Sequence, residues 1–217
     1  MTGLSTEERH IVELVREWVD KEVRPVVREL EHANTYPEDL IEQMKEMGIY
    51  GLAIPEPYGE TPVSMPCYVQ VTAELARGWM SLAGAMGGHT VVAKLLLLFG
   101  TDEQKQRYLP KMATGEIRAT MALTEPGGGS DLQNMRTSAR RDGDDWILNG
   151  SKTFISSGIN SDLVVVVCRT DPDPAAKHKA FSLLVVERGM PGFERGRKLD
   201  KIGLKAQDTA ELHFDDV

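Results

Sequence analysis

The hydrophobic periodicity of this chain changes near residue 116, and this change constrains the fold more than any other feature. Before it, apolar residues recur every three or four positions, as they do in amphipathic helices. After it, short runs of β-branched and apolar residues are separated by turn residues, as they are between strands. We therefore predict an α + β chain with an all-α domain over 1–116 and an all-β domain over 117–217.

Five helices are predicted in the first part, at about 6–24, 37–48, 68–76, 81–99 and 101–112. Two have recognisable starts, because Ser5 with Glu8 and Thr101 with Gln104 have the spacing of a capping box. The helix from about Ser81 to Phe99 is apolar nearly all round, so we expect it to be buried.

The second part is predicted to be a barrel or sandwich of about seven strands. The expected strands are 119–123, 137–141, 146–148, 154–156, 163–169, 181–186 and one that begins at 211. Arg141–Asp144 and Asn149-Gly150 are turn signals at hairpin spacing. We therefore expect a turn at Asn149-Gly150 between two short strands.

Composition excludes several classes of protein. The chain has 25 Lys and Arg against 33 Asp and Glu, a net charge of −8, so a nucleic-acid partner is not expected. The longest apolar run, Val91–Phe99, is far shorter than the ~20 residues that a membrane span needs. The N-terminus has neither a basic start nor an apolar stretch, so no signal peptide is expected. Cys67 and Cys168 have no metal-ligand spacing and are interpreted as reduced thiols of a cytoplasmic protein; no metal site is predicted.

The segment 121–131, MALTEPGGGSD, is the most informative one for function. Three consecutive glycines allow backbone amides to turn toward one point, where they suit an anion, and Ser130 adds a hydroxyl donor. Composition alone favours a flexible connection between two strands instead. The segment matches neither the GxxxxGK[ST] phosphate loop nor the strand–GxGxxG–helix context of a dinucleotide fold. A serine-hydrolase elbow is disfavoured, because the final glycine of G-x-S-x-G is missing after Ser130.

The segment 148–158, LNGSKTFISSG, combines an aromatic residue with hydroxyls. Phe154 and Ser156 are expected on one face of a strand, because side chains alternate along it. Such a face can stack on a flat ring and bond its edge. The alternative is an ordinary hairpin with a half-buried phenylalanine.

Together these segments resemble the acyl-CoA dehydrogenase flavoprotein family, in matching order along nearly the whole chain. The segments that carry the resemblance are Tyr36-Pro37, Met47-Gly48-Ile49, IPEPYG at 54–59, Phe99-Gly100-Thr101 with Gln104-Lys105, Tyr108-Leu109-Pro110, ALTEP at 122–126 with Gly129-Ser130-Asp131, NGSK at 149–152, and FDDV at 214–217.

The resemblance implies an N-terminal helical domain, a middle β-barrel and a further C-terminal helical domain. It also implies an oxidoreductase of fatty acid metabolism that uses FAD to convert an acyl-CoA thioester to the enoyl-CoA. A carboxylate base removes the α-proton, the flavin accepts hydride from the β-carbon, and the electrons pass to an electron-transferring flavoprotein. A homotetramer or homodimer is implied for the full-length protein.

The resemblance also assigns roles to individual residues. Met121, Leu123 and Thr124 are expected to border the isoalloxazine ring, Gly129 and Ser130 to lie by the flavin phosphate or ribityl part, Phe154 to pack on the flavin, and Ile155 and Ser156 to lie at its edge. Ser130 is also expected near the thioester end of the substrate. Phe154 stands where many members have Trp, and Ser156 where the family often has Thr, so stacking and the hydroxyl are both retained.

No general base is nominated among these residues. In the family a glutamate base lies on C-terminal helices, which are expected beyond Val217, and Glu125 belongs to the strand–turn motif. We therefore expect the 217 residues to be part of a longer enzyme and to be inactive alone. An acyl-CoA oxidase, a nitroalkane oxidase and a flavin monooxygenase of the same fold are alternatives, as is a non-catalytic module that binds acyl-CoA or assists assembly.

Overall fold

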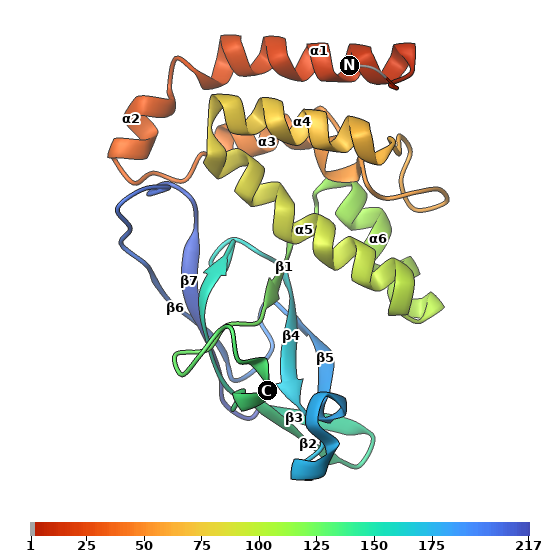
Figure 1. Ribbon diagram of the computed structural model, residues 1–217, viewed down its shortest axis with the longest axis vertical. Coiled ribbons are helices and arrows are strands. Elements are labelled where there is room, and N and C mark those ends of the chain that lie inside the picture. The colour runs from red at the N-terminus through yellow and green to blue at the C-terminus, as the bar shows by residue number, and fades with distance from the viewer. Residues whose placement is uncertain (1–2) are drawn as a thin grey trace. The chain divides into compact units, whose positions relative to one another are not determined.

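The computed structural model describes residues 3–217, which form two compact units. One contains the chain up to Ile117 together with Asp200–Gln207, and the other contains Arg118–Leu199 and Asp208–Val217. The first is helical and the second is a curled mixed sheet of seven strands, so the predicted fold class is confirmed (Figure 1).

Among its described residues the helical unit contains six α-helices. They are α1 Thr6–Trp18, α2 Val27–His32, α3 Glu38–Glu46, α4 Met65–Gly78, α5 Met80–Phe99 and α6 Asp102–Thr114, with a π-helical segment at Val19–Val23 and a 3-10 turn at Ile49–Gly51. Both predicted capping boxes are present, and in the second the Gln104 amide donates to the Thr101 hydroxyl at 3.2 Å.

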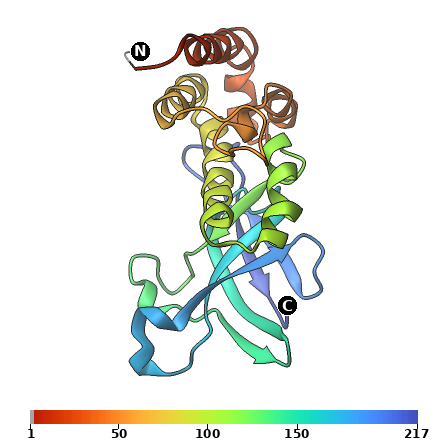
Figure 2. The same ribbon diagram turned by 90° about the vertical axis from the view of Figure 1, so that its right-hand side faces the viewer.

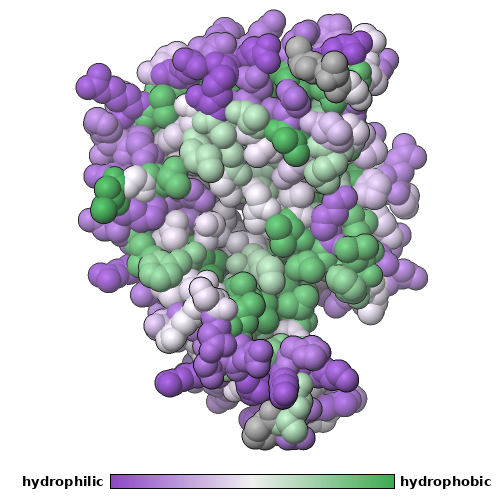
Figure 3. Space-filling view, in the orientation of Figure 1, coloured by the Kyte–Doolittle hydropathy of each residue, from purple (hydrophilic) through white to green (hydrophobic). Residues whose placement is uncertain are grey.

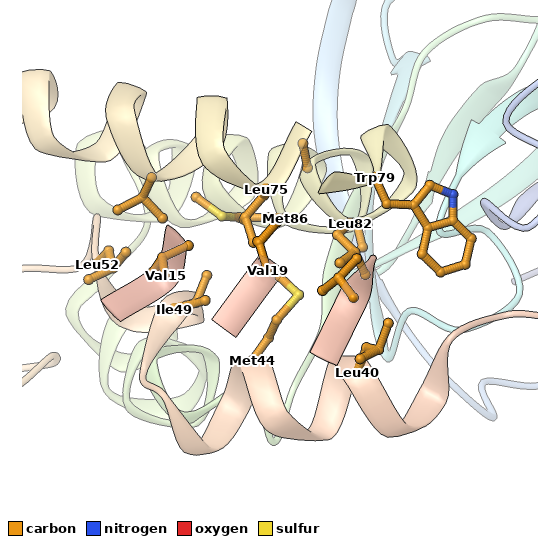
Figure 4. Close-up of a cluster of buried hydrophobic side chains, with 14 of the residues drawn as sticks. Val15, Val19, Leu40, Met44, Ile49, Leu52, Leu75, Trp79, Leu82 and Met86 are labelled. Carbon is orange, nitrogen blue, oxygen red and sulfur yellow. The ribbon is translucent and has the colours of Figure 1, made fainter. Parts of the chain in front are cut away.

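The core of this unit consists of apolar side chains from α1, the π-helical segment, α3, α4, α5 and the 3-10 turn. Val15, Val19, Met44, Leu75 and Met86 lie in it, and none of them exposes more than 2% of its surface (Figure 4). In α1 the buried residues are Val12 and Val15, whereas Leu14 exposes 57% of its surface.

The segment Asp200–Gln207 is held in the helical unit by Glu31 of α2. The Glu31 carboxylate accepts hydrogen bonds from the amides of Lys205 at 2.7 Å and Ala206 at 3.2 Å, and from the indole of Trp79 at 3.1 Å. Ala206 is fully buried. The compact units therefore do not follow the chain as two uninterrupted stretches.

Helix α5 is less buried than predicted. Ser81, His89 and other residues of one side are buried, but Leu98 and Phe99 expose 70% and 76% of their surface. Apolar side chains gather on the face of the molecule drawn in Figure 3. By length and composition α5 could cross a membrane, but a core helix of a soluble protein passes the same test, and 39% of its apolar window is buried. The absence of a membrane span therefore remains a prediction.

The seven strands of the second unit are β1 Ala119–Ala122, β2 Ser138–Asp142, β3 Asp145–Ser156, β4 Leu163–Arg169, β5 Phe181–Glu187, β6 Phe193–Lys198 and β7 Thr209–Phe214. Short 3-10 segments lie at Leu132–Asn134 and Pro174–Ala180. The path of hydrogen-bonded neighbours is β1-β4-β2-β3-β7-β6, and β5 pairs with β4. Figure 2 shows the curled strands of this unit from a second side. The core between the curled strands includes Leu148, Val164, Val166 and Leu212.

Two strand predictions were wrong. The predicted turn at Asn149-Gly150 lies inside the single long strand β3, which joins the two short strands predicted on either side of it. Gly150 has φ +142°, and there β3 changes partner, since Asn149 pairs with Ser138 of β2 and Gly150 with Phe214 of β7. Strand β6 was missed because it is rich in charged residues.

Strands β1 and β2 share one edge of β4. Strand β5 covers the other edge over Leu163–Arg169, whereas β1 pairs with Leu163–Val166 and β2 pairs at Arg169. Two positions of β4, 167 and 168, thus lie between the partners of Ala122 and Ser138. The segment 123–137 therefore leaves the sheet between the two strands and returns to the same edge.

Candidate functional site

The segment 123–137 contains the glycine-rich motif. It begins with a tight turn in which the Glu125 amide donates to the Gly128 carbonyl at 3.0 Å and the reverse bond measures 3.1 Å. Gly129 and Ser130 follow and are exposed. A Cβ atom added at Gly127 or Gly128 would meet no atom within 4 Å, so the outer part of the loop is open.

Glu125 closes the base of this loop. Its carboxylate accepts hydrogen bonds from the amide of Arg136 at 2.7 Å and from the amide of Thr137 at 2.9 Å. These amides lie where the chain returns to the sheet, so one side chain joins the start of the loop to its end. Glu125 exposes only 8% of its surface.

Lys152 of β3 is fully buried and contacts the same place. Its Nζ donates to the Glu125 carboxylate at 3.0 Å and to the Leu123 carbonyl at 2.9 Å. The ion pair joins the TEP and NGSK motifs, which lie 27 residues apart. Sequence reasoning did not assign a role to Lys152, which lies between the two short strands predicted at 146–148 and 154–156.

The titration of this pair follows from its environment. Burial raises the pKa of Glu125, but hydrogen bonds from Thr137, Arg136 and Lys152 outweigh it and hold the pKa below the ordinary value of 4.5. Burial lowers the pKa of Lys152, and the adjacent Glu125 carboxylate opposes this effect. Glu125 is therefore a bound carboxylate at neutral pH.

Phe154 lies in a β-bulge of β3. Between Lys152 and Ile155, β3 has one more residue than the facing stretch of β7 between Leu212 and Ala210. Phe154 has φ +59° and its surface is 66% exposed. Beyond the bulge burial still alternates, since Ile155 is buried whereas Phe154 is exposed and Ser156 half-buried. The expectation that Phe154 and Ser156 share one face therefore stays a prediction.

Hydrogen bonds bring the two predicted cofactor segments side by side. The Thr120 hydroxyl donates to the Ser156 carbonyl at 2.7 Å, and the Thr153 amide donates to the Thr124 carbonyl at 2.9 Å. Together with the bond from Lys152 to Leu123, they join the end of β1 to the bulge of β3.

The predicted site residues differ in exposure. Met121, Leu123, Thr124 and Ser156 are half-buried, Ile155 is buried, and Gly129, Ser130 and Phe154 are exposed. Gly129 lies near the joined segments, since a Cβ atom there would be 3.2 Å from Cγ2 of Thr124. No such contact links Ser130 to them in the described structure.

Asp208 holds the turn that follows β3, a role that sequence reasoning missed. Its carboxylate accepts from the amides of Ile159 at 2.9 Å and Asn160 at 2.8 Å, and its carbonyl accepts from the amide of Ser157 at 2.8 Å. Burial raises the pKa of Asp208 despite these bonds. Arg195 binds the same turn through the carbonyl of Gly158 at 2.9 Å.

Among the residues that the structure describes, no three His, Cys, Asp or Glu side chains are grouped so that they could hold a metal ion. Both cysteines are buried and free, and burial raises the pKa of Cys168 to about 11. The two joined segments present hydroxyls of Thr124 and Ser156 and the exposed ring of Phe154.

Comparison with known proteins agrees with this arrangement. The family models described as the acyl-CoA dehydrogenase N-terminal and middle domains match residues 5–116 and 120–217. The long-chain specific acyl-CoA dehydrogenase of Sus scrofa mitochondria is 42% identical over 205 residues, which cover 94% of this chain and 48% of that protein.

Solved structures show the same similarity. The acyl-CoA dehydrogenase of Geobacillus kaustophilus is 44% identical with a TM-score of 0.93, over 100% of this chain and 57% of that one. A structure described as the electron transferring flavoprotein of Acidaminococcus fermentans contains a chain with a TM-score of 0.93 and 34% identity, of which 57% is covered. The chain spans about half the length of the curated relatives it matches. The 217 residues therefore belong to the acyl-CoA dehydrogenase family and comprise its N-terminal and middle domains.

Proposed function

We propose that the whole protein of which these domains are part is an FAD-dependent acyl-CoA dehydrogenase. It would convert an acyl-CoA thioester to the enoyl-CoA and pass the electrons to an electron-transferring flavoprotein. The main support for this proposal is that the two segments predicted to bind the flavin, 121–131 and 148–158, are hydrogen-bonded to each other in one unit. When bound, FAD supplies the acceptor for a hydride from the β-carbon.

The strained backbone of Phe154 supports a flat ligand at this place. A non-glycine residue at φ +59° has an energetic cost, and such residues concentrate at functional sites. Exposure of two-thirds of the Phe154 surface to water does not stabilise this conformation. A flat ligand stacked on the Phe154 ring would bury apolar surface and so stabilise it. The residues present therefore fit an isoalloxazine ring.

The other predicted residues have distinct parts in this proposal. Met121, Leu123 and Thr124 would border the flavin ring, with Ile155 and Ser156 at its edge. Ser130, exposed on the open loop, would donate its hydroxyl to the flavin phosphate or ribityl part or to the thioester end of the substrate. Gly129 would let the backbone approach the cofactor closely, as a residue without a Cβ allows.

Glu125 does not serve as the general base in this proposal. Its carboxylate already accepts two backbone amides and the Lys152 ammonium, and its pKa is lowered. A base must reach the α-proton of the substrate and have a pKa suited to proton transfer. We propose that a glutamate outside these 217 residues has this role, and that these domains alone are inactive.

Partners and location are part of the same proposal. We propose an electron-transferring flavoprotein as the acceptor, because a chain of similar fold occurs in the Acidaminococcus fermentans structure described above. We also propose a homodimer or homotetramer in the cytoplasm. Light scattering of the full-length protein and microscopy of a fluorescent fusion test these two points.

Reconstitution of the full-length protein tests the function. With FAD added, it should become yellow and reduce an artificial dye when acyl-CoA of varied chain length is supplied. A protein that gains no flavin absorbance would refute the proposal. Oxygen consumption at a rate comparable to dye reduction would show an oxidase instead.

A further inference from the structure

We propose that Lys152 and Glu125 are a positioning pair that fixes the backbone of the flavin segment before the cofactor binds. This inference rests on the proposed function, because it names residues that hold the cofactor site without touching the cofactor. The pair lies in the gap of the sheet between β1 and β2, where the segment 123–137 leaves the edge of β4.

The gap creates an unusual demand for hydrogen bonds. The pairing of β1 with β4 ends at Ala122, and that of β2 with β4 is at Ser138. The Leu123 carbonyl and the amides of Arg136 and Thr137 lie between these two points, outside the paired residues. Buried backbone groups need a partner. Lys152 Nζ supplies one to the carbonyl, and the Glu125 carboxylate supplies one to each amide. The two side chains thus supply hydrogen bonds that a neighbouring strand would otherwise supply.

The position of these bonds makes the pair relevant to the flavin. Lys152 binds the carbonyl of Leu123, and the next carbonyl, that of Thr124, binds the amide of Thr153. Leu123 and Thr124 are the residues proposed to border the flavin ring, and Thr153 precedes Phe154 in the bulge. The Lys152 ammonium therefore holds Leu123 beside β3, next to the bond that joins Thr124 to Thr153.

A fully buried lysine is not explained by stability alone. Replacing a buried ion pair by apolar residues is often neutral or stabilising, whereas removal of one partner leaves an uncompensated charge. Among the ion pairs described here, this is the one in which both side chains are almost completely buried, at 0% and 8% exposure. The pair is therefore suited to holding the backbone at Leu123, Arg136 and Thr137 in one conformation.

The test compares Lys152→Met, the double variant Lys152→Met/Glu125→Gln and wild type in the full-length protein. The single variant leaves Glu125 buried without its cation, so both stability and FAD affinity should fall, the affinity at least tenfold. The double variant removes the uncompensated charge, so its melting temperature should recover toward wild type. Its FAD affinity should stay at least tenfold weaker, because the Leu123 carbonyl is still unbound.

Glu74→Gln is the matched control. Glu74 is also nearly buried, at 9% exposure, and binds Arg16 at 2.7 Å in the helical unit. This change should lower stability without weakening FAD binding. FAD affinity is measured from flavin fluorescence, at a temperature where each variant is folded.

Hydrogen exchange of the apoprotein separates this inference from the proposed function. In the double variant the amides of Arg136, Thr137 and Thr153 should exchange at least tenfold faster than in wild type, while those of Ile159 and Asn160, which bind Asp208, stay unchanged. Unchanged exchange at all five amides, or FAD affinity that recovers together with stability, would overturn the inference. Wild-type protein that binds no FAD would instead refute the proposed function, whatever the exchange result.

Discussion

Replacement of Gly150 by alanine tests whether β3 really runs straight through the Asn149-Gly150 pair. Gly150 has φ +142°, a conformation that costs a side-chain-bearing residue about 1–3 kcal/mol. A Cβ atom would also lie 2.6 Å from Oγ1 and 2.7 Å from Cα of Thr137. Because the Cα belongs to the backbone, the contact is not relieved by a rotamer change, and overpacking adds about 1–3 kcal/mol. We expect a loss of about 2–6 kcal/mol in the free energy of unfolding of the β unit.

Gly143→Ala is the control for this prediction. Gly143 has φ +64° in the turn between β2 and β3, and a Cβ atom there would meet no atom within 4 Å. It should cost about 1–2 kcal/mol, from the left-handed backbone alone. Native-state hydrogen exchange of β3 and β7 amides at increasing urea measures both losses in the β unit itself. A Gly150→Ala variant that loses no more stability than Gly143→Ala would refute the close packing against Thr137.

Further changes give distinct outcomes. Phe154→Gly should leave the β unit as stable as wild type or stabilise it by about 1 kcal/mol, since it removes backbone strain, yet weaken FAD binding at least tenfold; urea unfolding and flavin fluorescence measure the two effects. Glu125, whose folded pKa is lowered, contributes stability above pH 4.5 that is lost as the pH falls, so the stability difference between wild type and Glu125→Gln should shrink on acidification. The pKa of Asp208 is raised in the folded state, so the stability difference between wild type and Asp208→Asn should instead shrink as the pH rises above 3.8. If the two stability differences changed with pH in the same direction in unfolding titrations, these assignments would be contradicted. Ser5→Ala should lower the stability of the helical unit by about 0.5–2 kcal/mol through loss of the N-cap, as measured by thermal unfolding followed by circular dichroism.

Local sequence signals predicted the helical unit well because its helix ends and apolar stripes are local properties. Ser5 and Glu8 satisfy each other within one turn, so their spacing alone predicts the capping box. The exposed side of α5 could not be predicted in this way. The sequence shows that Leu98 and Phe99 are apolar, but which side of α5 is buried depends on where the other helices pack against it.

The β unit was harder to predict because its details depend on residues distant in the chain. Asn149-Gly150 has the local signature of a tight turn, yet Thr137 and the partner strands hold it extended. The bulge at Phe154 appears only when β3 is aligned with β7.

The candidate site combined both kinds of information. Resemblance to the family identified the two motif segments, and the structure shows them hydrogen-bonded to one another. The bond between Lys152 and Glu125 had no local signal, because each residue is unremarkable in its own segment. The pairing follows only from the interruption between β1 and β2, which places the start and end of the glycine loop beside β3.

Anaerobic reduction of the bound flavin tests the central claim most directly. The full-length protein, loaded with FAD and mixed with an acyl-CoA in the absence of oxygen, should lose its oxidised flavin absorbance. One enoyl-CoA should form for each flavin reduced, and adding an electron-transferring flavoprotein should restore the absorbance. A loaded protein whose flavin is not reduced by acyl-CoA of any chain length would contradict the assignment as an acyl-CoA dehydrogenase.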